Sequence, residues 1–237
     1  MNSLARPLIT IALSCLLAAC PSVTRVTRPP VEKPALPPTP AVDLRGAVVY
    51  GVNPQASTVH ILVYRGGTLA RLGHNHVLTS RSLSGRVWVN PALEKSGFEL
   101  SFPVAQLTVD DPEARRAAGS DFPAGISQAD RDSTRKNMLK AEVLDAERYP
   151  DVTLQSVRVA GTPQAPQITA RINIRNASRD VPVSAAVKTE GTRLTATGEF
   201  DIQQTDFGIK PFSAGLGALE VQDRLQVRFT VVADREE

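Results

Sequence analysis

The chain has 237 residues, with 27 basic and 24 acidic side chains and a formal net charge of +3 at pH 7. This near balance, without a long basic run, gives no support to a nucleic-acid-binding function. Both cysteines, Cys15 and Cys20, lie close to the N-terminus, so the rest of the chain offers no disulfide and no thiol chemistry.

Residues 1–19 have the pattern of a signal peptide. Arg6 precedes an apolar run from Leu8 to Ala19, which as a helix would rise only about 18 Å, too short for a bilayer core of roughly 30 Å. The end of the run, Leu-Ala-Ala-Cys, resembles the lipobox of bacterial lipoproteins. That resemblance implies that Cys20 is lipidated and becomes the mature N-terminus. The alternative is an ordinary secretory signal with a cysteine nearby by chance.

Residues 20–45 form a predicted proline-rich tether, with PPVEKPALPPTP at its centre. Proline supplies no backbone donor, so the segment favours extended polyproline II and a spacer role. By resemblance to lipoproteins, we expect a periplasmic protein anchored to a membrane through its N-terminal lipid. Pro21 and Ser22 replace the Asp that often retains lipoproteins at the inner membrane, which favours the outer membrane.

Residues 46–234 are long enough for one domain, and apolar residues alternate with polar ones along most of it. Alternation of this kind predicts antiparallel strands with one buried face. The predicted strands are 58–64, 82–89, 97–103, 152–159, 168–175, 181–188, 192–202 and 223–232. A helical pattern is confined to 127–150, where Ser127 and Asp130 resemble a capping box, and to a short helix within 110–126.

About eight antiparallel strands must either split into a sandwich or close, because free sheet edges are a liability. A closed barrel of eight strands has room for one small ligand or is filled by its own side chains. The predicted inner faces are nearly all aliphatic or Phe, which suits an apolar guest. The sequence leaves open whether the lumen is filled.

Three stretches resemble the YceI-like family: VVYGVNPQASTVHILVYRGG, DRDSTRKNMLKAEVLDAERYPDVTLQS, and TGEFDIQQTDFGIKPFSAGLGALEVQDRLQVRFTVVA, with its turn at Asp206–Ile209. They span residues 48–233. The resemblance implies an all-β, antiparallel, eight-stranded, lipocalin-like barrel with a helical insertion, which binds a polyisoprenoid or another long-chain lipid. The candidate pocket residues are His74, His76, Val87, Phe98, Leu100, Ile172, Phe200 and Phe229.

The histidines of RLGHNHVL (71–78) admit several interpretations. If the stretch is extended, His74 and His76 share a face, and a His-x-His pair with a third imidazole is a zinc-site pattern. His60 completes the set if it pairs opposite His74, and faces away if it pairs opposite Gly73. Residues 51–93 contain no Asp or Glu to orient such ligands. The alternatives are polar contacts to a ligand head group, or hydrogen bonds to backbone near Gly73.

No Gly-x-Ser-x-Gly, His-Glu-x-x-His or P-loop motif is present in the sequence. We therefore expect a binding protein without a cofactor and without catalytic residues. That its ligand is an apolar chain is implied by the family resemblance, and the apolar strand faces are compatible with it. The rival hypotheses are a zinc-binding protein or hydrolase that uses His60, His74 and His76, and a ligand-free structural module of the cell envelope. The sequence does not indicate an oligomeric state.

Overall fold

The computed structural model describes residues 42–237, and these belong to one compact unit. The predicted signal peptide (1–19), the lipidation of Cys20 and most of the tether (20–45) lie outside the described residues. No helix among residues 42–237 is long and apolar enough to cross a membrane.

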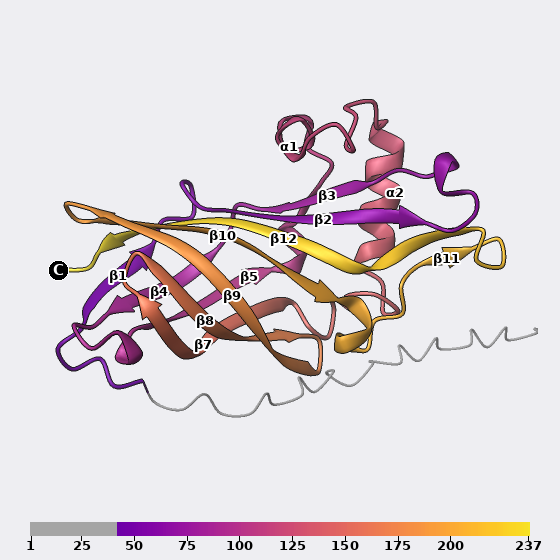
Figure 1. The fold of residues 1–237 in the computed structure, drawn as a ribbon. Coiled ribbons are helices and arrows are strands. Elements are labelled where there is room, and N and C mark those ends of the chain that lie inside the picture. The colour runs from indigo at the N-terminus through magenta and orange to yellow at the C-terminus, as the bar shows by residue number, and fades with distance from the viewer. Residues whose placement is uncertain (1–41) are drawn as a thin grey trace, which may run out of the picture. The chain divides into compact units, whose positions relative to one another are not determined.

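Eight antiparallel strands close into a barrel (Figure 1). The ring is closed where the first strand pairs with the end of the last, Tyr50 opposite Arg235. This confirms the predicted eight-stranded barrel. In spatial order the strands of the ring are β1 (Val48–Val52), β4 (Ser84–Val89), β5 (Gly97–Pro103), β7 (Asp151–Thr162), β8 (Ala165–Ile174), β9 (Ala177–Glu190), β10 (Arg193–Gln203) and β12 (Leu219–Arg235).

The strands beside β12 on one side of the ring are interrupted. Next to β1, the same edge of β12 pairs with β2 (Thr58–Gly66). Between the two strands, the buried hydroxyl of Ser57 donates to the backbone carbonyl of Val232 and accepts its backbone N–H. β2 pairs with β3 (His76–Ser80), which pairs with β6 (Thr108–Val109). A short β11 (Ser213–Ala214) lies on the start of β12. The alternation of the sequence did not predict β1, β6 or β11, and β3 overlaps only the end of the stretch 72–78 that was considered as possibly extended.

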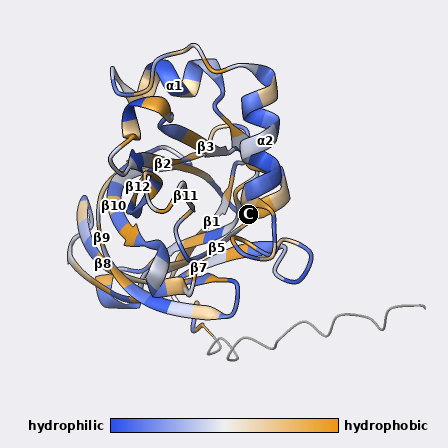
Figure 2. Ribbon diagram, turned by 90° about the vertical axis from the view of Figure 1, so that its right-hand side faces the viewer, coloured by the Kyte–Doolittle hydropathy of each residue, from blue (hydrophilic) through white to orange (hydrophobic). Residues whose placement is uncertain are grey.

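The helical insertion covers the outside of β2 and β3 (Figure 2). It contains α1 (Pro112–Ala118) and α2 (Gln128–Met138), and Ser127 accepts the backbone N–H of Asp130 at 3.1 Å as the predicted cap. The predicted helix to residue 150 was wrong, because α2 ends at Met138. A straight helix over 127–150 would be about 36 Å long. Instead, turns bring Val143 and Leu144 back to the barrel lumen.

Two apolar clusters form most of the core. The larger lies inside the barrel and includes Leu83, Phe102 and Phe207. The smaller lies between the insertion and the outer face of β2 and β3, where Leu62 and Val77 pack with Ala114 and Phe122. The strands β2 and β3 are therefore buried on both faces. Four 3₁₀ turns complete the described elements: η1 (Ala70–Leu72), η2 (Leu93–Lys95), η3 (Val104–Gln106) and η4 (Gln204–Phe207).

Candidate functional site

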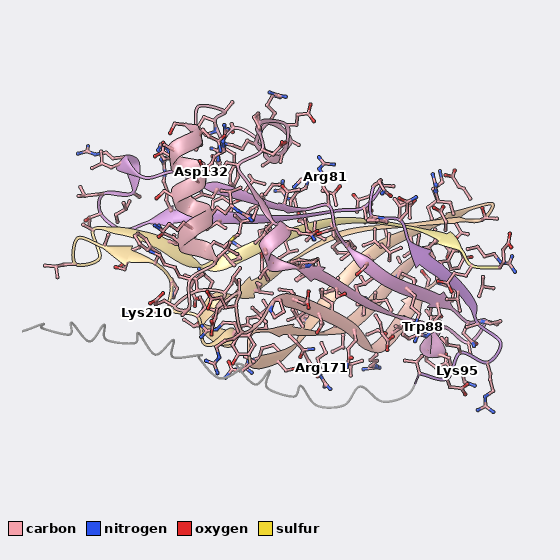
Figure 3. The ribbon with its side chains drawn as sticks, turned by 180° about the vertical axis from the view of Figure 1, so that it is seen from behind. Arg81, Trp88, Lys95, Asp132, Arg171 and Lys210 are labelled. Carbon is pink, nitrogen blue, oxygen red and sulfur yellow. The ribbon has the colours of Figure 1, made fainter. Side chains whose placement is uncertain are left out.

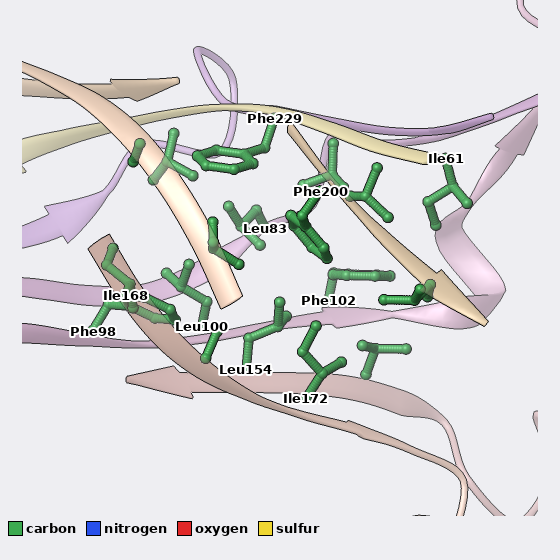
Figure 4. Close-up of a pocket in the computed structure, with 18 of the residues that line it drawn as sticks. Ile61, Leu83, Phe98, Leu100, Phe102, Leu154, Ile168, Ile172, Phe200 and Phe229 are labelled. Atoms are coloured by element: carbon green, nitrogen blue, oxygen red, sulfur yellow. The ribbon is translucent and has the colours of Figure 1, made fainter. Parts of the chain in front are cut away.

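The barrel encloses a cavity of about 680 Å³. The volume lies within the range of roughly 300–1,000 Å³ that small-molecule sites occupy. Aliphatic and Phe side chains from the barrel strands point into it (Figure 4). The lumen is therefore not filled by its own side chains, and the filled-barrel alternative does not describe this structure.

The space arises from small residues on three neighbouring strands. Ala170 on β8, Ala185 on β9 and Ala196 on β10 all line the cavity. Gly198 pairs with both Ala185 and Phe229, and a Cβ at residue 198 would lie 2.7 Å from the Phe229 ring. The absence of a side chain at Gly198 lets that ring lie against the barrel wall. Larger residues at these positions would close the lumen.

Polar side chains in the cavity wall gather toward its two ends. Near Trp88 and η2 they are Ser96, Gln164, Lys188 and Thr189. At the other end, beside α2 and η4, they are His76, Thr134, Asn137, Gln204 and Lys210. Trp88 and Lys210 lie toward opposite ends of the barrel (Figure 3). The long apolar middle with polar ends suits an elongated ligand whose body is apolar.

Seven of the eight predicted pocket residues line this cavity: His76, Val87, Phe98, Leu100, Ile172, Phe200 and Phe229. The eighth, His74, does not line it. His74 is exposed in the loop before β3, because the strand begins only at His76. The zinc alternative required residues 72–78 to be extended throughout. They are not, so His74 and His76 do not form a His-x-His pair on a strand.

The three-histidine set of the zinc alternative is also not formed. His60 pairs with Thr79, and its Nδ1 lies 3.0 Å from the Thr79 hydroxyl. The loop between β2 and β3 contains η1 and is longer than the expected turn at Gly66–Gly67. The partner of His60 is therefore neither His74 nor Gly73, the two possibilities that the sequence left open. His60 consequently faces outward, whereas His76 faces the lumen. Residues 42–237 contain no cluster of three His, Cys, Asp or Glu side chains suited to a metal. The pKa of His60 is lowered chiefly by burial of its side chain, and further by the positive charges of Arg81 and Arg228.

His76 instead belongs to a buried charged network. Its Nδ1 lies 2.6 Å from Asp110 Oδ2, and the other carboxylate oxygen accepts the backbone N–H of Val77 at 2.9 Å and Arg115 Nη1 at 2.5 Å. The side chains of Asp110 and Arg115 are 0% and 1% exposed. Sequence reasoning missed Asp110 because it lies 34 residues from His76, on the segment that leads from β6 to α1.

Asp110 fixes the orientation of the imidazole. Burial alone would raise the pKa of Asp110, but hydrogen bonds from His76, Val77 and Arg115 hold that pKa below its usual range. The carboxylate is therefore ionised, and His76 Nδ1–H donates to it. The side chain of His76 lines the cavity, and its Nε2 has no hydrogen-bond partner within residues 42–237. The network thus fixes Nδ1 and leaves the other nitrogen of this cavity-lining imidazole available for a hydrogen bond.

Arg115 connects this network to the insertion. Its Nη1 donates to the Asn75 carbonyl at 2.7 Å and its Nε donates to the Pro123 carbonyl at 2.8 Å. Asn75 in turn donates to the Asp121 carbonyl at 2.9 Å and accepts the Arg65 N–H at 3.0 Å. The insertion and the start of β3 are therefore held together by buried polar contacts, which fix His76 against the cavity end.

The chain belongs to the YceI-like domain family, whose model matches residues 50–233. Among solved structures, BcnA of Burkholderia cenocepacia is similar, with 18% identity and a TM-score of 0.55, covering 77% of this chain and 99% of that one. A polyisoprenoid binding domain from Saccharophagus degradans is also similar, with 14% identity, a TM-score of 0.54, and coverage of 80% and 99%. These likenesses show the shared fold. No curated protein sequence matches the chain significantly.

Replacing Asp110 tests the buried network. Asp110→Asn should lower the free energy of unfolding by about 3–5 kcal/mol, because it leaves Arg115 buried without its counter-charge. The matched control is Asp180→Asn, which breaks an exposed pair with Arg171 and should cost less than about 1 kcal/mol. Urea unfolding followed by circular dichroism measures both. Equal costs for the two variants would contradict the assigned role of Asp110.

The same variant should change the response to acid. Since the pKa of Asp110 is depressed in the fold, its stabilisation is complete above the unfolded pKa of about 3.9 and is lost as pH falls through the lower folded value. Asp110→Asn should therefore lose less stability than the parent chain between about pH 5 and pH 2. If the variant and the parent chain lose the same stability over this pH range, Asp110 does not titrate within it.

Proposed function

We propose that this protein binds one elongated apolar ligand, a polyisoprenoid or a fatty-acid-like chain, in the lumen of its barrel. The observation that carries the proposal is the cavity of about 680 Å³ with its aliphatic and Phe wall. Membership of the YceI-like family supports it, as does the fold shared with a domain whose name describes polyisoprenoid binding. Transfer of the ligand's apolar surface from water would supply most of the affinity.

His76 is proposed to contact the polar end of that ligand. With Nδ1 held by Asp110, Nε2 can accept a hydrogen bond when the ring is neutral and donate one when it is charged. Covalent catalysis with this imidazole as the activating base would need a protein nucleophile within hydrogen-bond reach of it. Among the described residues, His76 makes no hydrogen bond to a hydroxyl or thiol. We therefore propose a binding protein and assign His76 to ligand orientation.

Blocking the lumen should abolish binding. Ala196→Trp places an indole in the cavity, whereas Thr197→Trp places the same side chain one position along β10, on the exposed outer face. Titration of residues 42–237 with a fluorescent long-chain probe should give at least tenfold weaker binding for Ala196→Trp, because the indole occupies the ligand's space. Thr197→Trp should bind like the parent chain. Equal binding by both variants would place the ligand outside the barrel.

Removing the imidazole should weaken binding only of ligands with a polar end. His76→Leu should reduce affinity for an alcohol-ended chain by about 2- to 12-fold, the loss of one hydrogen bond worth roughly 0.5–1.5 kcal/mol. Affinity for the matching hydrocarbon should not fall, since leucine keeps the wall apolar. Calorimetric titration with the two chains measures the difference. An equal loss for both ligands would show that His76 does not distinguish the polar end.

We further propose that the chain is exported, cleaved before Cys20 and anchored through a lipid on that residue in the outer membrane, facing the periplasm. The proposal is supported by the apolar run at 8–19 and the lipobox-like Leu-Ala-Ala-Cys. In a bacterial host, the N-terminal peptide of the protein should carry a diacylglyceryl mass on Cys20, and the protein should sediment with the outer membrane. Cys20→Ser should lose that mass and the membrane association. An unmodified Cys20 in the parent chain would contradict the anchor.

A further inference from the structure

Two loops meet at the end of the barrel where Lys210 lines the cavity. We call residues 65–74 and 208–219 the mouth loops. They contact each other directly, because the backbone N–H of Leu69 donates to the Ala218 carbonyl at 2.7 Å. In Figure 1 η1 and β11, which lie in these loops, occupy the same end of the molecule. Phe212 lines the cavity and is 50% exposed, so the cavity reaches the surface at this place.

The mouth loops carry most of the exposed large apolar side chains. Five such side chains are exposed among residues 42–237, and four of them, Leu69, Leu72, Phe212 and Leu216, lie on these loops. The fifth, Val157, lies on β7. Single exposed apolar residues need no explanation, but a group gathered around the opening of an apolar cavity marks an interaction surface.

Leu216 has a left-handed backbone conformation, which is energetically unfavourable for a leucine. Leu216 and Gly217 have φ of 56° and 89°, and Ala218 N–H donates to the Gly215 carbonyl at 3.1 Å. This is the pattern of a type I′ turn, whose first central position favours Asn, Asp or Gly. Leu216 is fully exposed, and neither the turn nor the hydration of the side chain favours a leucine at this position.

The charges of the mouth loops indicate which surface they meet. Arg65, Arg71 and Lys210 are exposed on these loops, and they outnumber the acidic residues beside them, which are Asp206 before the second loop and Glu220 next to Gly217. Apolar side chains beside basic ones are the combination that binds anionic bilayers, where the apolar groups enter the interface and the cations stay among the head groups. Between copies of this chain, the same basic loops would repel each other if they met face to face.

We propose that the mouth loops dock on an anionic lipid bilayer, with Leu72, Phe212 and Leu216 inserted into its interface. The docked end is the end at which the cavity opens, so an apolar ligand would pass between bilayer and lumen without crossing water. The docking itself does not depend on what the cavity holds. It is also separate from an N-terminal lipid, because it requires only residues of the folded domain.

A local probe separates loop insertion from anchoring elsewhere. In the full chain with Cys15→Ser and Cys20→Ser, a single cysteine is introduced by Leu216→Cys or, as the control, by Val157→Cys. Each is labelled with the same environment-sensitive dye and mixed with phosphatidylcholine–phosphatidylglycerol vesicles. The dye at residue 216 should shift to the blue and be quenched by quencher-bearing lipids, and the dye at residue 157 should do neither. If neither dye shifts to the blue nor is quenched, the proposal is overturned.

Further variants of the chain labelled at residue 216 test the chemistry. Leu72→Asn should raise the lipid concentration needed for half-maximal shift on the order of tenfold, and Arg71→Gln by about fivefold, with less shift at high salt. A blue shift that appears without vesicles and grows with protein concentration would overturn the proposal in favour of docking to a second copy. In the unlabelled chain, Leu216→Asn should keep or raise thermal stability, which separates docking from folding.

Discussion

Closure of the sheet is the constraint on which the rest of the structure depends. The pairing of β1 with the end of β12 joins the first and last strands of the ring and so closes a ring of eight strands. A ring of this size has an interior that side chains can just fill. Here Ala170, Ala185, Ala196 and Gly198 leave part of it open. The alternation that folds the chain thus also produces an apolar compartment.

The two ends of the barrel are not equivalent. The insertion lies at the end beside α2, and it packs on the outer face of β2 and β3 through a second apolar cluster. The buried Asp110 and Arg115 join the insertion to β3 and hold His76 against the lumen. The mouth loops, with their exposed leucines, lie at this same end. The polar contact, the opening and the proposed docking surface therefore occur together.

Much of the fold could be predicted because strand alternation is a local property. The inward faces of β8, β10 and β12 follow directly from the sequence, as does the cap at Ser127. The register of β2 with β3 could not be predicted, since it depends on the length of the loop between them. The partner of His76 could not be found either, because Asp110 is remote in sequence. A positive φ at Asp110 and its position before an N-capping Asp111 became visible only in the structure.

The central claim is that the lumen holds an apolar chain. It is tested most directly by native mass spectrometry of residues 42–237 purified from bacterial cells and incubated with a bacterial lipid extract, followed by organic extraction of the same sample. The account predicts a complex heavier than the polypeptide by the mass of one lipid, which the solvent removes as an apolar chain. A protein that retains only its polypeptide mass after that incubation would contradict it.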